Sequence, residues 1–183
     1  MTLANFKNIL HKINLKHKLV KNMDDISLKI LMILQKKARI PNIEVARQVG
    51  MAPSGVLERV RKLERQGIID GYEVRLNPVR FDRGLVAFVF IIPQSDSDQS
   101  DLGKALAAIP DVQEVHYVAG EDGFMAKVRV SDTAQLERVR REKIIALPQV
   151  RSTRTVIALQ TYKETARFPL DDSAIQKLKK RRT

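Results

Sequence analysis

The 183-residue chain contains 44% apolar residues, enough to bury a core in one large or two small domains. It holds no apolar run long enough to span a bilayer and no secretory signal with a cleavage site, so we expect a cytoplasmic protein with no membrane partner. The absence of cysteine excludes disulfides and thiolate sites. The three histidines lie at no zinc-site spacing, so we expect neither a metal nor a cofactor.

The formal net charge of +12 is unevenly distributed. Residues 1–78 hold 15 Lys and Arg against 7 Asp and Glu, residues 79–164 hold 12 against 12, and residues 165–183 hold 6 against 2. This asymmetry is typical of a polyanion-binding domain joined to a neutral domain. A basic surface that serves solubility alone is the simpler alternative.

The two ends of the chain are basic. Residues 1–22 lack acidic residues and repeat apolar side chains at helical spacing, which predicts a basic amphipathic extension. It could contact a partner subunit, the DNA backbone or a membrane surface, and the first two fit the rest of the chain better. Residues 165–183 form a basic tail, for which solvated disorder is the default and DNA-backbone contact the alternative.

Three short helices are predicted before residue 70. The first follows a cap at Asp24 or Asp25 and runs to about Lys37. The second spans residues 43–49, with Ile43, Val45, Ala46 and Val49 inward, and ends at Gly50; the third begins at Pro53 and ends before Gly67. Residues 68–76 contain an Asp70-Gly71 turn and predict a hairpin. Residues 23–78 therefore predict a winged helix-turn-helix with an interdomain strand.

The third predicted helix turns an apolar stripe inward and a largely basic face outward. Its outward side chains include Glu58, Arg59, Lys62 and Arg65, with Arg61 at the border. A solvated charged face explains such a pattern equally well in isolation. Within a helix-turn-helix, we expect the guanidinium of Arg59 to reach a guanine edge, and Lys62 and Arg65 to meet phosphates.

The second half alternates strands and helices. Strands are predicted at 85–92, 112–118, 124–130 and 150–162, with helices at 102–109 and 131–147 between them. This order is that of a ferredoxin-like βαββαβ domain over residues 79–164, so the fold class is α+β. Its sheet leaves one face without helices and in need of a partner.

The stretch LERVRKLERQGIIDGYEVRLNP, Leu57–Pro78, resembles the recognition helix, wing and interdomain strand of the Lrp/AsnC transcription regulators. MDDISLKILMILQ and LVAFVFI are similar to the family as well, and the resemblance spans residues 23–164. It implies a DNA-binding domain followed by a ligand-binding domain, homodimers that go on to octamers, and an amino acid as effector. The resemblance also places Ser54, Gly55, Arg59 and Arg61 at DNA-contacting positions.

The chain departs from the family pattern in two places. Ala52 stands where a Ser cap is common, and Gly55 replaces a common Pro, which predicts a looser start of the recognition helix. In the effector loop Gly123 stands where the family has Asp. The residues expected to bind an effector are Gly120, Asp122, Gly123, Thr153 and Thr155.

The main hypothesis is a sequence-specific regulator that binds double-stranded DNA as a homo-oligomer and has no catalytic residue. The alternative is a sirohaem decarboxylase-like enzyme of the same fold, for which His116 and the arginines of the second domain are the candidate residues. A third interpretation is nonspecific DNA compaction. The first predicts preferred operators, the second a coloured tetrapyrrole complex, and the third equal affinity for all sequences.

Overall fold

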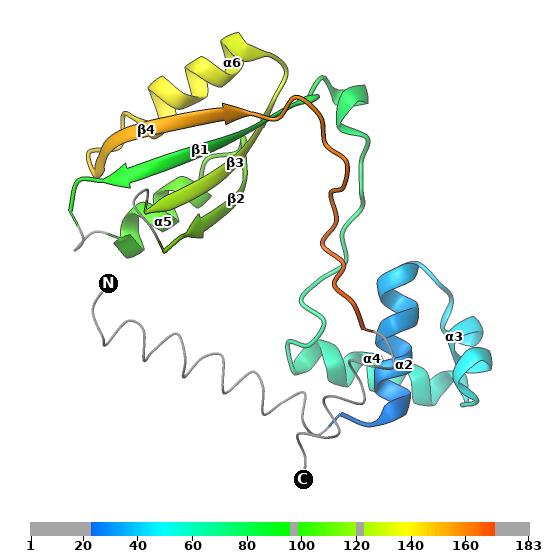
Figure 1. Ribbon diagram of the computed structural model, residues 1–183. Coiled ribbons are helices and arrows are strands. Elements are labelled where there is room, and N and C mark those ends of the chain that lie inside the picture. Colours follow the sequence, from blue (N-terminus) through cyan, green and yellow to red (C-terminus); the bar gives the residue numbers. More distant parts are fainter. Residues whose placement is uncertain (1–22, 96–98, 120–122, 171–183) are drawn as a thin grey trace. The chain divides into compact units, whose positions relative to one another are not determined.

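The computed structural model describes residues 23–95, 99–119 and 123–170, and the chain divides into two compact units (Figure 1). The first comprises Met1–Val74 with Thr165–Thr183, and the second comprises Arg75–Glu164. The predicted basic extension and most of the basic tail lie outside the described residues. Among those described, no helix is long and apolar enough to cross a membrane.

The first unit contains the three predicted helices, α2 (Asp25–Lys36), α3 (Asn42–Val49) and α4 (Pro53–Arg65). Asp24 is the cap of α2, because its carboxylate accepts from the amide of Ser27 at 2.7 Å. The predicted glycine stops are confirmed, since Gly50 and Gly67 both adopt positive φ, the conformation in which a side chain costs most.

A small apolar core holds these helices together. Its buried members are Ile30, Leu34, Val45, Ala46, Val56 and Val60. The prediction that Ile43 faces this core is wrong, because its side chain is 69% exposed. Two residues of an α-helix turn the chain through about 200°, so Ile43 points away from the side that buries Val45.

The predicted hairpin after α4 is also not formed, because residues 66–77 contain no strand. The amides of Ile68 and Ile69 both donate to the carbonyl of Leu63, at 2.9 and 3.3 Å, and so close the end of α4. Donors used in this way are not available to a β-ladder. The side chain of Tyr72 instead returns to α4, where its hydroxyl donates to Glu64 at 3.0 Å.

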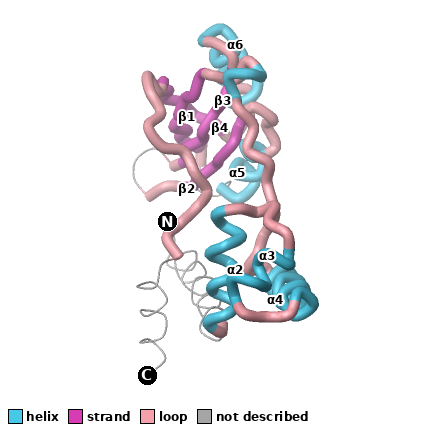
Figure 2. The backbone as a smooth tube through the Cα atoms, turned by 90° about the vertical axis from the view of Figure 1, so that its right-hand side faces the viewer, coloured by secondary structure: helices cyan, strands magenta, loops and turns pink. Residues whose placement is uncertain are grey.

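The second unit is a four-stranded antiparallel sheet in the order β2-β3-β1-β4, which confirms the ferredoxin-like prediction. After a short turn η1 (Pro78–Phe81), its elements are β1 (Leu85–Pro93), α5 (Gln99–Ala107), β2 (Val112–Tyr117), β3 (Phe124–Val130), α6 (Thr133–Arg138) with its π-helical continuation η3 (Val139–Ile144), and β4 (Val150–Ile157). In Figure 2, α5 and α6 lie beside the strands.

The last strand is shorter than predicted. β4 pairs with β1 as far as Ile157 opposite Ala87, and the amide of Ala158 then donates to the carbonyl of Val86 at 2.9 Å. Because β1 begins at Leu85, residues beyond 158 have almost no strand left to pair with. The segment that follows β4 is therefore irregular.

One face of the sheet packs against the helices of this unit. Alternate residues of β1 and β3 join α5, α6 and η3 in the core, whose buried members are Ala87, Val89, Ile91, Leu102, Leu106, Ile109, Phe124, Ala126, Val128, Val130, Leu136, Val139 and Ile144. On β3 the intervening positions, including Lys127 and Arg129, belong to the opposite face, which we call the open face.

Candidate DNA-binding surface and effector domain

One face of α4 presents a row of exposed polar and charged residues. Val56, Val60 and Leu63 are buried on the opposite face. Apart from the adjacent pair Arg61 and Lys62, the members of this face follow one another at spacings of three or four positions, which places them on one side of the helix. This set, which we call the α4 row, comprises Ser54, Glu58, Arg61, Lys62 and Arg65. Of the predicted DNA-contacting residues, Gly55 and Arg59 are only partly exposed.

The start of α4 lacks a side-chain cap. Its N-cap is Ala52, which makes no capping hydrogen bond, and Pro53 follows at the first helical position. The first turn also contains no acidic residue, so the positive end of the helix dipole is not offset there. A Cβ at Gly55 would lie 3.0 Å from Cε of Met51, the end of a flexible side chain that can move aside.

Arg59 points back into its own unit. Its Nη1 donates to Asp24 Oδ2 and, at 3.1 Å, to Oγ of Ser27. Burial raises the pKa of Asp24, but the hydrogen bonds from Arg59 and from the amide of Ser27 outweigh it, so the pKa of this carboxyl is below its ordinary value. The arginine expected to read a base is therefore held by the cap of α2.

The structure places the predicted effector residues at different positions around the sheet. Gly120 and Asp122 lie outside the described residues. Gly123 precedes β3, and Thr153 and Thr155 belong to β4, on the helix-covered side where Arg140 donates to Oγ1 of Thr153 at 3.4 Å. The hydroxyl of Thr155 is buried without a hydrogen-bond partner among the described residues.

Gly123 has a structural reason to be glycine. Its φ is +81°, and a Cβ there would lie 2.7 Å from Cδ of Pro93 and 3.3 Å from the carbonyl oxygen of Ile91. The aspartate that the family pattern has at this position would therefore collide with β1. The lack of a side chain at Gly123 allows its close approach to Pro93.

We expect Gly123→Asp to destabilise the second unit rather than to create an effector site. Positive φ and the collision with Pro93 should together cost on the order of 1–3 kcal/mol. Urea unfolding followed by circular dichroism measures this cost. Gly84→Asp is the matched control, because the nearest atom to a Cβ at Gly84 is 3.9 Å away. Equal losses for the two variants would contradict the explanation.

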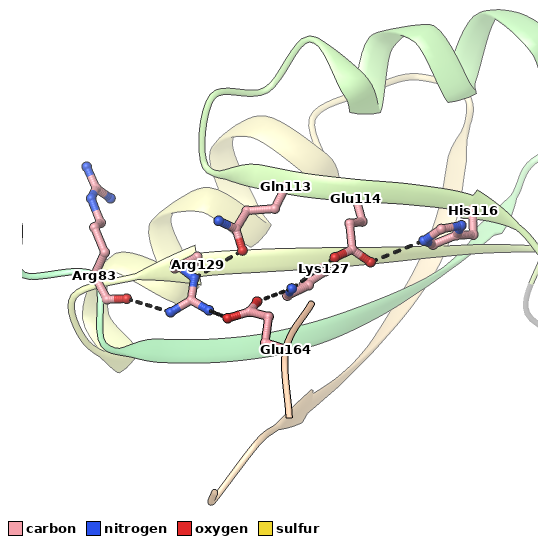
Figure 3. A network of polar contacts seen from close by, with 7 residues as sticks. All are labelled: Arg83, Gln113, Glu114, His116, Lys127, Arg129 and Glu164. Atoms are coloured by element: carbon pink, nitrogen blue, oxygen red, sulfur yellow. Dashed lines mark hydrogen bonds and ion pairs between the residues drawn. The ribbon is translucent and has the colours of Figure 1, made fainter. Parts of the chain in front are cut away.

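The open face carries an ionic network that the sequence analysis did not anticipate (Figure 3). Lys127, whose side chain is 10% exposed, donates to Glu164 and, at 2.9 Å, to Glu114. Arg129 donates to Glu164 at 2.7 Å, to Gln113 at 3.0 Å and to the carbonyl of Arg83 at 3.1 Å. His116, a candidate residue of the enzyme alternative, lies 3.3 Å from Glu114.

The network shifts the pKa values of its members. The hydrogen bond from Lys127 is the main cause that lowers the pKa of both Glu164 and Glu114. Burial lowers the pKa of Lys127, but the hydrogen bonds to Glu164 and Glu114 outweigh burial and raise it. All three groups are therefore held in their charged forms.

Acidification should weaken the second unit through this network. A carboxyl whose pKa is lower in the folded chain contributes stability fully above its unfolded pKa, here the ordinary value of 4.5, and loses it as pH falls through the folded value. We therefore expect the unfolding temperature of wild type to exceed that of Glu164→Gln at about pH 6, and this difference to shrink towards about pH 3. Differential scanning calorimetry across this range checks it, and parallel curves would contradict it.

Family models match both units. The ligand-binding domain of the Lrp/AsnC proteins matches residues 86–168, and a winged helix-turn-helix DNA-binding model matches residues 23–70. The leucine-responsive regulatory proteins of Escherichia coli K12 and Klebsiella pneumoniae are each 37% identical over 150 residues, which cover 81% of this chain and 92% of theirs. The chain belongs to the Lrp/AsnC family. It is a transcription regulator of this type, with a DNA-binding and a ligand-binding domain.

Solved structures of Lrp/AsnC proteins share the fold. AsnC of E. coli is 28% identical with a TM-score of 0.73, covering 81% of this chain and 99% of that one. The leucine response regulatory protein of Mycobacterium tuberculosis is 34% identical with a TM-score of 0.70, covering 78% of this chain and 96% of that one. These comparisons favour the regulator over the decarboxylase-like alternative.

Proposed function

We propose that this Lrp/AsnC regulator binds pseudo-palindromic operators as a homodimer, with the α4 row of each subunit in a major groove. The observation that carries the proposal is the exposure of Arg61, Lys62 and Arg65 on one side of a helix whose other side is fully occupied by the core. A symmetric dimer presents two such helices to two half-sites. Assembly into octamers is part of the same proposal, as is a location in the cytoplasm, where chromosomal DNA is accessible.

The uncapped start of α4 supports contact with the DNA backbone. The amides of Ser54 and Gly55 receive no side-chain acceptor, and a phosphate near the positive end of the helix dipole would provide one. The side chain of Ser54 can donate to the same phosphate. Arg61, Lys62 and Arg65 then divide between base edges and phosphates along the groove.

An amino acid is the proposed effector of the second domain. Support comes from the ligand-binding family model and from relatives named as leucine-responsive. The candidate residues remain Gly120, Asp122, Gly123, Thr153 and Thr155, of which Thr155 has an unused hydroxyl. Calorimetric titration with a panel of amino acids tests this part, and no heat with any of them would remove it.

Selection of genomic fragments by the purified protein, followed by footprinting, tests the DNA-binding proposal. The expected result is a small set of fragments that share an inverted repeat, and the measured mass should correspond to a dimer or a multiple of it. Equal retention of all fragments would favour DNA compaction instead. A visible absorbance band from bound tetrapyrrole, without any promoter binding, would favour the decarboxylase-like alternative.

A further inference from the structure

The carboxylate of Asp24 makes two different contacts. One oxygen accepts from the amide of Ser27 at 2.7 Å and caps α2, while the other accepts from Nη1 of Arg59 on α4. The same Nη1 lies 3.1 Å from Oγ of Ser27, a residue only 8% exposed. One guanidinium therefore joins the N-terminus of α2 to the second turn of α4. We call these three residues the α2–α4 clamp.

The clamp adds a polar contact to a helix that the core already holds through Val56, Val60 and Leu63. The helix starts at Pro53 with no side-chain cap. The side chain of Arg59 is 29% exposed, whereas its neighbours in the α4 row are exposed. An arginine that already donates to a carboxylate must give up that charge-assisted bond before it can reach a base.

We propose that Arg59 is a positioning residue, which with Asp24 and Ser27 sets the orientation of α4 and does not itself read a base. This inference rests on the proposed function, in which the α4 row contacts DNA. It replaces the sequence-based expectation that the guanidinium of Arg59 binds a guanine. Base reading then belongs to the exposed members of the row, such as Arg61.

The direction in which one substitution changes operator affinity distinguishes the two roles of Arg59. Asp24→Asn keeps an N-cap of equal quality for α2 but removes the charged acceptor of Arg59. If Arg59 reads DNA, this change frees it and removes a negative charge near a polyanion, so operator affinity should rise. If Arg59 positions α4, operator affinity should fall, by about three- to tenfold for a coupled pair of this kind.

Asp70→Asn is the matched control, because it also removes one negative charge from an exposed residue of the first unit but lies outside the α4 row. Its operator affinity should rise or stay unchanged under either role. Thermal unfolding of all variants checks that each is folded at the assay temperature. Fluorescence anisotropy with labelled operator and with scrambled DNA then gives the affinities.

Arg59→Gln and the double variant with Asp24→Asn complete the test. Positioning predicts that the double variant binds no more weakly than the weaker single variant, and that Arg59→Gln leaves the slope of log affinity against log salt unchanged. A phosphate contact predicts a slope smaller by about 0.9, whereas a base contact predicts relaxed preference at one base pair. Higher affinity of Asp24→Asn for the operator would overturn the clamp, whereas absence of any preferred operator for wild type would overturn the proposed function.

Discussion

Replacing Arg61, Lys62 and Arg65 together with alanine is expected to abolish operator binding at physiological salt. Three lost phosphate or base contacts should lower affinity by about 100-fold or more and reduce the salt slope by about two to three. All three side chains are exposed and lie outside the core, so the fold should survive. Anisotropy titrations at several salt concentrations measure both quantities.

The matched control for this variant removes the same charge from the second unit. Lys104, Arg141 and Arg151 are exposed there, and their combined replacement with alanine lowers the net charge equally. Its affinity should change far less than that of the α4 triple variant. Equal loss in the two triple variants would mean that total charge, rather than the α4 row, controls binding.

Ile30→Ala is expected to have the largest effect on stability. Ile30 has no exposed surface and belongs to the small core formed by α2, α3 and α4. Truncation of a buried isoleucine costs about 2–5 kcal/mol, which for a unit of this size lowers its unfolding temperature by about 10 °C or more. Calorimetry should show this lower temperature for the unfolding transition of the first unit. Operator binding should be lost above that temperature.

Two controls separate local from general destabilisation. Ile91→Ala removes an equally buried side chain from the core of the second unit, so it should lower the other transition. Leu57→Ala lies on α4 but is 37% exposed, and its effect should be smaller. A single unfolding transition whose temperature falls equally in Ile30→Ala and Ile91→Ala would contradict independent unfolding of the two units.

Local sequence patterns predicted most of this architecture. Asp24 before an apolar helical repeat, and glycines at 50 and 67, define helix ends through chemistry that acts within a few residues. Alternation along FMAKVRV likewise identified β3. These features depend on the backbone near each residue and need no knowledge of the tertiary structure.

The features that sequence reasoning missed depend on contacts between distant residues. The partner of Arg59 is 35 positions away, and the partner of Lys127 in the segment after β4 is 37 positions away. The hairpin prediction failed because the carbonyl of Leu63 accepts from the amides of Ile68 and Ile69, which the first strand of a hairpin would have needed. Lys127 and Arg129 at alternate positions of a strand were the available signal for the open-face network.

Arg129 has a consequence for how the chain is assembled. By holding the carbonyl of Arg83 and the carboxylate of Glu164 with one guanidinium, it brings the first and last segments of the sheet domain to the same place. The first unit consists of two separate segments of the chain, so the sheet domain has the arrangement of a domain inserted into another domain. Exchange of residues 75–164 for the corresponding part of a relative should therefore change the sensor and leave the residues that contact DNA intact.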